Sequence, residues 1–223
     1  LLNNTLSTVS KVDNNTFAVF NTHSWVHGGV VTLSPEQSAG YHSVVDITTG
    51  KEALSQQLST GELAFRAEDI PALGCKKYML QTKKNRTTGS FVKGRVLDNG
   101  IVKVTVDPLT GDVVSLMHQG EEFVNKEDMS AVNSYRYLKG NDSSGKAFKA
   151  INNRISVKED GPLLATLLVE SDAEGCNKLT REITIIAGQP HVEFKNLVDK
   201  IAITDKEGIH FGFAFDIPNS TTK

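Results

Sequence analysis

Apolar and polar residues alternate with a period of two along most of this chain. In "IVKVTVD", residues 101–107, the three valines fall on one face of an extended strand, and Lys103 and Thr105 fall on the other. The turn-forming stretches "DNG" and "DPLTGD" flank this segment, and "VVSLMH" follows the second of them. The pattern therefore predicts consecutive antiparallel strands joined by tight turns.

Further strands are predicted wherever β-branched and aromatic residues gather between Gly, Pro, Asn or Asp turns. They are expected in "TFAVFNT", "GGVVTL", "HSVVDIT", "ELAFRA", "RISVKE", "LLATLLVES", "KLTREITIIAG", "HVEFKNLVDK" and "IHFGFAFDI". A turn is expected around Pro71 and Gly74, and after it another strand through Tyr78. In the last segment Phe211, Phe213 and Phe215 share one face, which we expect to face a core. No window holds a helical period beyond ~10 residues, and "SPEQSAG" predicts one turn at most. The expected fold class is all-β.

The polar, glycine-punctuated stretch "KNRTTGSFVKG", residues 84–94, predicts a domain boundary. We expect a small β-sandwich over residues 1–88 and a second β domain over residues 89–223. The second part has too many long strands for a simple seven-strand module, so a large sandwich of two sheets is expected there.

Composition narrows the functional classes. The 223 residues carry a formal net charge of −2, with 39% hydrophobic and 22% charged residues, as in ordinary globular proteins. No basic face is visible, so no nucleic-acid partner is expected. No apolar run reaches the ~18 residues of a membrane span, and no signal peptide is visible, so a soluble protein without a membrane partner is expected, in a compartment that the sequence does not indicate. The chain does not begin with methionine and reads as a piece of something longer.

Three groups of residues are candidates for chemistry, and each has a simpler structural interpretation. His23 and His27 would lie ~13 Å apart on one strand, too far for a shared zinc ion. Trp25, the single tryptophan, could stack on a sugar, but it is expected to pack in the core. Cys75 and Cys176 are expected to be free and buried rather than paired.

No catalytic residues and no metal ligands are predicted. The paired acids stand in hydrophilic, turn-like surroundings, where they are expected to be solvated and so unsuited to glycosidase chemistry. These acids are Glu121 with Glu122, Glu127 with Asp128, Glu159 with Asp160, and Asp205 with Glu207. Neither a nucleophile elbow nor a phosphate-binding loop occurs in the sequence.

Tyr135 and Tyr137 are the candidate substrate-binding residues. Alternation places both on one face of a strand, ahead of a polar, glycine-bearing loop. Such tyrosines can stack on a sugar and bind it through their hydroxyls. A sheet-packing pair with hydroxyls at the rim is an equally good interpretation.

Several of these segments resemble, in order and spacing, the C-terminal β region of glycoside hydrolase family 38, the α-mannosidases. "FAVFNTHSWVHGGVV" resembles the family pattern V-x-N-x-x-S-W-x-R, and "EDIPALGCKKYML" resembles I-P-A-x-G-Y-x-x-Y. "VLDNGIVKVTVDPLTGDVVSLMHQGEEFV" resembles the hairpin L-E-N-x-x-x-x-V-x-x-D-x-x-T-G-x-I-x-S-L, the most specific of the set. "NSYRYLKGND" and "DKEGIHFGFAFDIPN" also fit.

The resemblance implies a non-catalytic part of a retaining α-mannosidase, with residues 89–223 forming the N-terminal part of a large, mutarotase-like β-supersandwich. The family's aspartate nucleophile and its divalent metal, usually zinc, lie in a barrel domain that this chain lacks. The implied partners are that catalytic barrel and a helical domain of the same parent chain, together with an α-mannoside substrate. In some members a tyrosine of the large sandwich reaches the sugar, and Tyr135 aligns with it, with Tyr137 in reserve.

Two other functions remain open. One is a stand-alone carbohydrate-binding or adhesion sandwich. The other is a mutarotase-like isomerase, which would need a histidine and a glutamate converging on one sheet face, with His118, His191 and His210 as the available histidines. A cut sandwich would also expose unpaired strand edges, through which we expect self-association or strand addition.

Overall fold

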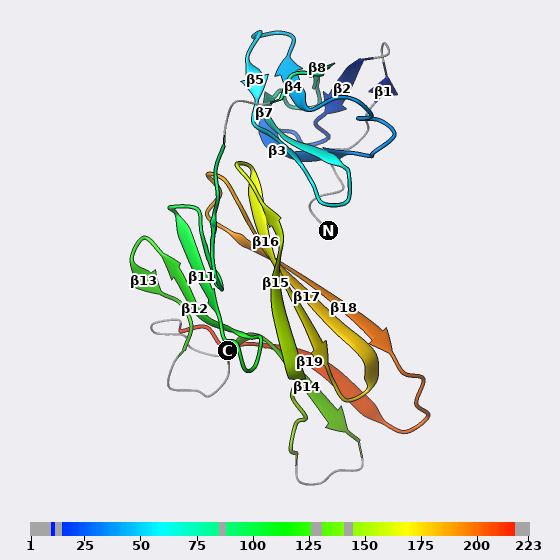
Figure 1. Ribbon diagram of the computed structural model, residues 1–223, viewed down its shortest axis with the longest axis vertical. Coiled ribbons are helices and arrows are strands. Elements are labelled where there is room, and N and C mark those ends of the chain that lie inside the picture. The colour runs from blue at the N-terminus through cyan, green and yellow to red at the C-terminus, as the bar shows by residue number, and fades with distance from the viewer. Residues whose placement is uncertain (1–9, 12–14, 85–87, 126–130, 141–144, 217–223) are drawn as a thin grey trace. The chain divides into compact units, whose positions relative to one another are not determined.

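The computed structural model describes residues 10–11, 15–84, 88–125, 131–140 and 145–216 (Figure 1). All regular structure in these residues is β, which confirms the expected all-β class. None of the described residues builds a helix that would be long and apolar enough to cross a membrane. "SPEQSAG" forms turns.

The chain divides into two compact units. Unit 1 comprises Leu1–Ser90 and Gly161–Leu163, and unit 2 comprises Phe91–Asp160 and Leu164–Lys223. The boundary expected after residue 88 lies close to the end of the first segment of unit 1. The return of three residues from the middle of the chain was not expected. Leu163 donates its backbone N–H to the buried Gln56, which ties this short segment into unit 1.

Unit 1 contains two antiparallel sheets around one core. The first sheet has the order β1 (Ser10–Lys11), β2 (Thr16–Phe20), β8 (Cys75–Gln81), β4 (Ser43–Asp46), β5 (Glu52–Ala53), and the second β3 (His27–Leu33), β7 (Leu63–Ile70), β6 (Ser55–Gln57). Phe17 and Tyr78 from the first sheet meet Phe65 from the second, with ring centroids 5.6 and 5.1 Å from that of Phe65. Side chains from both sheets interlock in this way, as in a β-sandwich.

Unit 2 also contains two antiparallel sheets. The larger has the order β19 (Glu207–Phe213), β14 (Val132–Lys139), β12 (Val113–His118), β11 (Val102–Val106), β10 (Val96–Asp98), β9 (Val92–Lys93), with β13 (Glu121–Glu122) paired to β12. The smaller has the order β15 (Ile151–Asp160), β16 (Leu164–Asp172), β17 (Cys176–Ile186), β18 (Val192–Lys200). The valines of β11 are buried, as predicted, and pack with Leu167 and Ile183 of the other sheet.

The phenylalanines of the last strand are less buried than the alternating pattern predicted. Phe211 packs against a buried cluster, but Phe213 and Phe215 remain 46% and 41% exposed. The reason is their position, because β19 is the edge strand of its sheet and Phe215 lies beyond its end. Phe213 contacts Phe194 of β18, and neither ring is fully covered.

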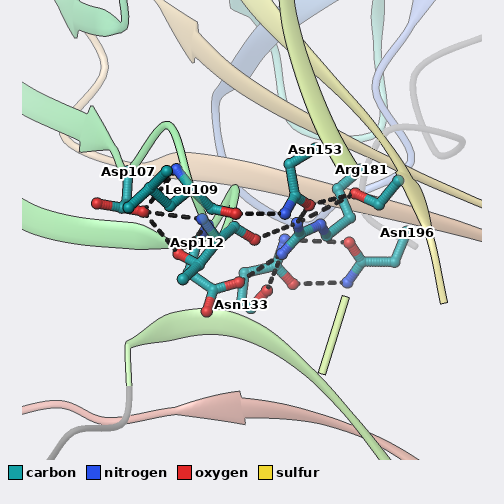
Figure 2. A network of polar contacts seen from close by, with 9 residues as sticks. Asp107, Leu109, Asp112, Asn133, Asn153, Arg181 and Asn196 are labelled. Atoms are coloured by element: carbon teal, nitrogen blue, oxygen red, sulfur yellow. Dashed lines mark hydrogen bonds and ion pairs between the residues drawn. The ribbon is translucent and has the colours of Figure 1, made fainter. Parts of the chain in front are cut away.

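A buried arginine joins the two sheets of unit 2 (Figure 2). Arg181 on β17 is fully buried, and its guanidinium donates to the carboxylate of Asp112 at 2.6 Å and to the backbone oxygen of Thr110 at 2.9 Å. It also donates to the backbone oxygen of Asn133 at 3.1 Å, where β14 carries a bulge and Asn133 has φ of 59°. Asn133 in turn exchanges two amide hydrogen bonds with Asn196 of β18. These contacts fix the position of one sheet against the other.

The turn between β11 and β12 is shaped to receive this arginine. Asp107 accepts the backbone N–H groups of Leu109 and Thr110 at 2.9 and 2.8 Å. Gly111 has φ of 67°, and a Cβ at that position would lie 2.4 Å from Nη2 of Arg181. Glycine is therefore required both by the backbone conformation and by the approach of the guanidinium.

Replacing Asp112 by alanine should lower the free energy of unfolding of unit 2 by about 3–5 kcal/mol, because it leaves a buried guanidinium without its counter-ion. The matched control is Lys103→Ala, which removes the exposed partner of Asp98 and should cost less than about 1 kcal/mol. Urea unfolding followed by far-UV circular dichroism measures both variants. Equal losses in the two variants would contradict the role assigned to Arg181.

Candidate functional site

The loop between β2 and β3 presents the most exposed aromatic group of the described chain. Trp25 is 58% exposed, which corrects the expectation that it packs in the core. Its ring stacks on His23, with centroids 4.7 Å apart and planes inclined by 26°. The rings of His27 and His23 are in a T-shaped arrangement, with centroids 4.8 Å apart. One face of the indole is therefore covered by imidazole.

The two histidines lie much closer together than a strand would place them. Residues 21–26 lie outside any strand, with bends at residues 23–25, so the separation of ~13 Å expected for extended backbone does not apply. Within the residues that the structure describes, no three His, Cys, Asp or Glu side chains come together as a metal site would require.

Asn21 holds this loop in place. It is 2% exposed and donates from its amide to the backbone oxygens of Trp25, Ile70 and Pro71 at 2.8, 3.0 and 3.1 Å. Its side-chain oxygen accepts the backbone N–H of His23 at 2.9 Å. The tip of the β7–β8 turn therefore lies beside the loop, which places Leu73, 75% exposed, next to the aromatic cluster.

Tyr135 and Tyr137, the predicted sugar-binding residues, lie in a buried cluster. They are 1% and 2% exposed and pack with Leu179 and Cys176. The hydroxyl of Tyr135 donates to the backbone oxygen of Glu174 at 2.6 Å, and that of Tyr137 to the carboxylate of Glu207 at 2.5 Å. These contacts favour the sheet-packing interpretation, and a role in sugar binding stays a prediction.

The tyrosines organise the end of unit 2 where β14, β17 and β19 meet. Gly175, with φ of 82°, leaves room for the ring of Tyr137, since a Cβ there would lie 2.3 Å from that ring. Glu207 also forms an ion pair with Lys200 at 2.5 Å. This bond and the bond from Tyr137 hold the pKa of Glu207 below its usual range.

Of the paired acids in the described part of the chain, Glu122 and Glu159 have structural surroundings. Glu122 accepts hydrogen bonds from the hydroxyl of Ser115 and the backbone N–H of Leu116, so its carboxylate is committed to the β12–β13 turn. Glu159 is 8% exposed, which corrects the expectation that it is solvated; beyond the register irregularity of β15 it lies opposite the buried Thr166 of β16. Glu127 and Asp128 lie outside the described residues.

His118, His191 and His210, the histidines available for an isomerase, lie on or beside three different strands. His118 lies on β12 beside Phe123, and His210 is exposed on β19. His191 precedes β18 and approaches Glu193 at 3.6 Å, with both side chains substantially exposed. His191 and Glu193 therefore form a pair at the surface rather than in an enclosed site.

The cysteines are free, as expected, but they differ in burial. Cys176 is buried, whereas Cys75 is exposed at the start of β8. The expectation of two buried thiols is thus wrong for Cys75. Side chains along β8 alternate between the core face and the solvent face, and Cys75 lies on the solvent face.

Comparison with known proteins does not identify the chain. No protein-family model matches the sequence, and no curated protein matches it.

The stability of unit 1 and that of unit 2 should both depend on pH in the alkaline range, because each unit contains at least one buried tyrosine. Burial raises the pKa of Tyr78 to about 12 from its ordinary value of 10.0, and also raises that of Tyr135. The hydrogen bond to Glu207 raises the pKa of Tyr137 to about 12. The folded protein therefore binds these protons more tightly than the unfolded chain does.

Stability should consequently be unaffected by these groups below pH 10.0 and should fall as the pH rises from there towards about 12. Tyrosinate absorbance, recorded together with far-UV circular dichroism, measures this. We expect the ionisation of the three tyrosines to coincide with loss of β structure. Ionisation of all the tyrosines near pH 10.0 with the sheets intact would contradict the burial described above.

Proposed function

We propose that this chain is a non-catalytic β region of a glycoside hydrolase family 38 α-mannosidase, which supports a sugar-cleaving centre carried by another part of the parent polypeptide. The observation that carries the proposal is that two motifs of the resemblance, 50 residues apart, are built into one structure. Asn21 of "FNTHSW" binds the backbone oxygens of Ile70 and Pro71 of "IPALG". Leu73 of the second motif donates to the backbone oxygen of His23 in the first.

The residues of the third motif have equally structural roles. Asn99 of "LDNG" accepts the backbone N–H of Val102 and donates to the backbone oxygens of Ile186 and Gln189. Asp107 and Gly111 of "DPLTGD" shape the turn that receives Arg181. The motif residues thus form turns and sheet contacts, as expected of a supporting region. The zinc ion and the nucleophile belong, on this proposal, to the parent's barrel domain.

The isolated chain should not hydrolyse an aryl α-mannoside, with or without added zinc, because retaining hydrolysis needs two carboxyl groups about 5–5.5 Å apart across the scissile bond. The assay compares release of the aryl alcohol with a buffer blank and with a complete α-mannosidase. Turnover above the blank that co-purifies with the chain would overturn the non-catalytic assignment.

A second candidate, a carbohydrate-binding sandwich, is favoured by one observation. Trp25 is exposed and supported from beneath by His23, which leaves one face of the indole open for the apolar face of a pyranose ring. This candidate is compatible with the first, because a supporting region can also hold a sugar chain.

Titration with methyl α-D-mannopyranoside tests the second candidate through the fluorescence of Trp25, the single tryptophan. A sugar held on one ring should bind with a dissociation constant of about 1 mM, and Trp25→Ala should abolish the binding measured by calorimetry. Leu109→Ala, an exposed change in unit 2, is the matched control and should bind as the parent does. No saturable binding would remove the carbohydrate-binding candidate and leave the first proposal untouched.

A further inference from the structure

Strand β18 forms one edge of the smaller sheet of unit 2 (Figure 1). In the described residues it pairs with β17 alone. From Val192 to Asp199 its register with β17 is unbroken along the strand, and the one irregularity of the pair lies opposite Lys200. An edge strand of this length presents a row of backbone groups to any further strand.

The other long edges carry the devices by which proteins block strand addition. β15 has two register irregularities against β16, and β3 has one against β7. β19 carries two glycines and faces a bulge in β14. Edges β1, β5, β6 and β9 have three residues or fewer. β18 is therefore the one long, regular edge in the part of the chain that the structure describes.

The outward face of β18 carries a self-complementary pattern. Lys195, Leu197 and Asp199 lie two residues apart and so share one face, and all three are exposed. Leu197, at the centre, is 43% exposed, and its cross-strand partner Thr180 is half-buried. A cation and an anion thus flank an exposed apolar side chain at equal spacing.

We propose that β18 pairs in an antiparallel direction with β18 of a second copy of this chain, about a two-fold axis at Leu197. In that register the two Leu197 side chains face each other. Lys195 of each copy lies opposite Asp199 of the other, which gives two cross-strand ion pairs. The two smaller sheets become one continuous sheet across the pair.

The charges disfavour the registers whose axis lies on the N-terminal side of Leu197. Moving the axis to Asn196 places Glu193 opposite Asp199, two like charges, on both sides of the axis. Moving it to Lys195 places two lysines face to face. Directly opposed like charges destabilise an antiparallel pair, whereas opposite charges stabilise it. The proposal does not depend on the proposed function.

Sedimentation velocity and light scattering on the full chain, over a series of concentrations, test the proposal. The parent chain should dimerise in a concentration-dependent way. Leu197→Lys, an exposed substitution, should weaken association at least about tenfold, because it opposes two ammonium groups at the axis. Val157→Lys on β15, which is similarly exposed, is the matched control and should dimerise as the parent does.

A charge exchange separates β18 pairing from nonspecific association. Lys195→Glu and Asp199→Lys should each weaken the dimer about tenfold, and the double variant should restore it, because the ion pairs re-form with reversed sign. Far-UV circular dichroism checks that each variant is folded. A parent chain that is monomeric at all concentrations would overturn the proposal. So would a dimer that is insensitive to Leu197→Lys, or a double variant no better than the single ones.

Discussion

The fold of unit 2 depends on a positive charge held between two sheets. Arg181 stands among Leu179, Ile183 and Ile185 on the buried face of β17, where an unpaired guanidinium would cost several kcal/mol. Its partners come from the β11–β12 turn and from β14 (Figure 2), so the ion pair forms when the larger sheet presents these groups in one arrangement. The buried contacts of Arg181 therefore link the position of the two sheets, the shape of the β11–β12 turn and the bulge at Asn133.

In both units, polar side chains form hydrogen bonds that hold loops and turns in place. Asn21 in unit 1 and Asn99 in unit 2 satisfy backbone groups of loops that are distant in sequence, and Glu122 and Glu207 accept from nearby donors. Side chains that could have served as acids, bases or ligands are used in architecture instead. In the described residues, Trp25 is the aromatic side chain left most exposed at the surface.

Period-two alternation was enough to predict the longer strands and the all-β class, because such strands bury one face; the valines of β11 are the clearest case. The short strands β1, β5, β6, β9 and β13 were not predicted. What alternation could not predict depended on neighbours far away in sequence. Trp25 is exposed because Asn21 bends the loop towards Ile70, and Phe213 is half-covered because no strand lies beyond β19 in the described sheet. Arg181 interrupts an apolar face in the sequence, but its partner Asp112 lies 69 residues earlier, and local periodicity cannot pair two residues so far apart.

The central claim is that these sheets support a catalytic centre located elsewhere in the same polypeptide. The most direct test is to sequence the reading frame that precedes Leu1 in the source gene. The account predicts an in-frame α/β barrel that carries an aspartate and a set of Asp and His metal ligands, followed by a helical domain. A reading frame that joins these sheets to an unrelated domain, or that places no barrel before them, would contradict it.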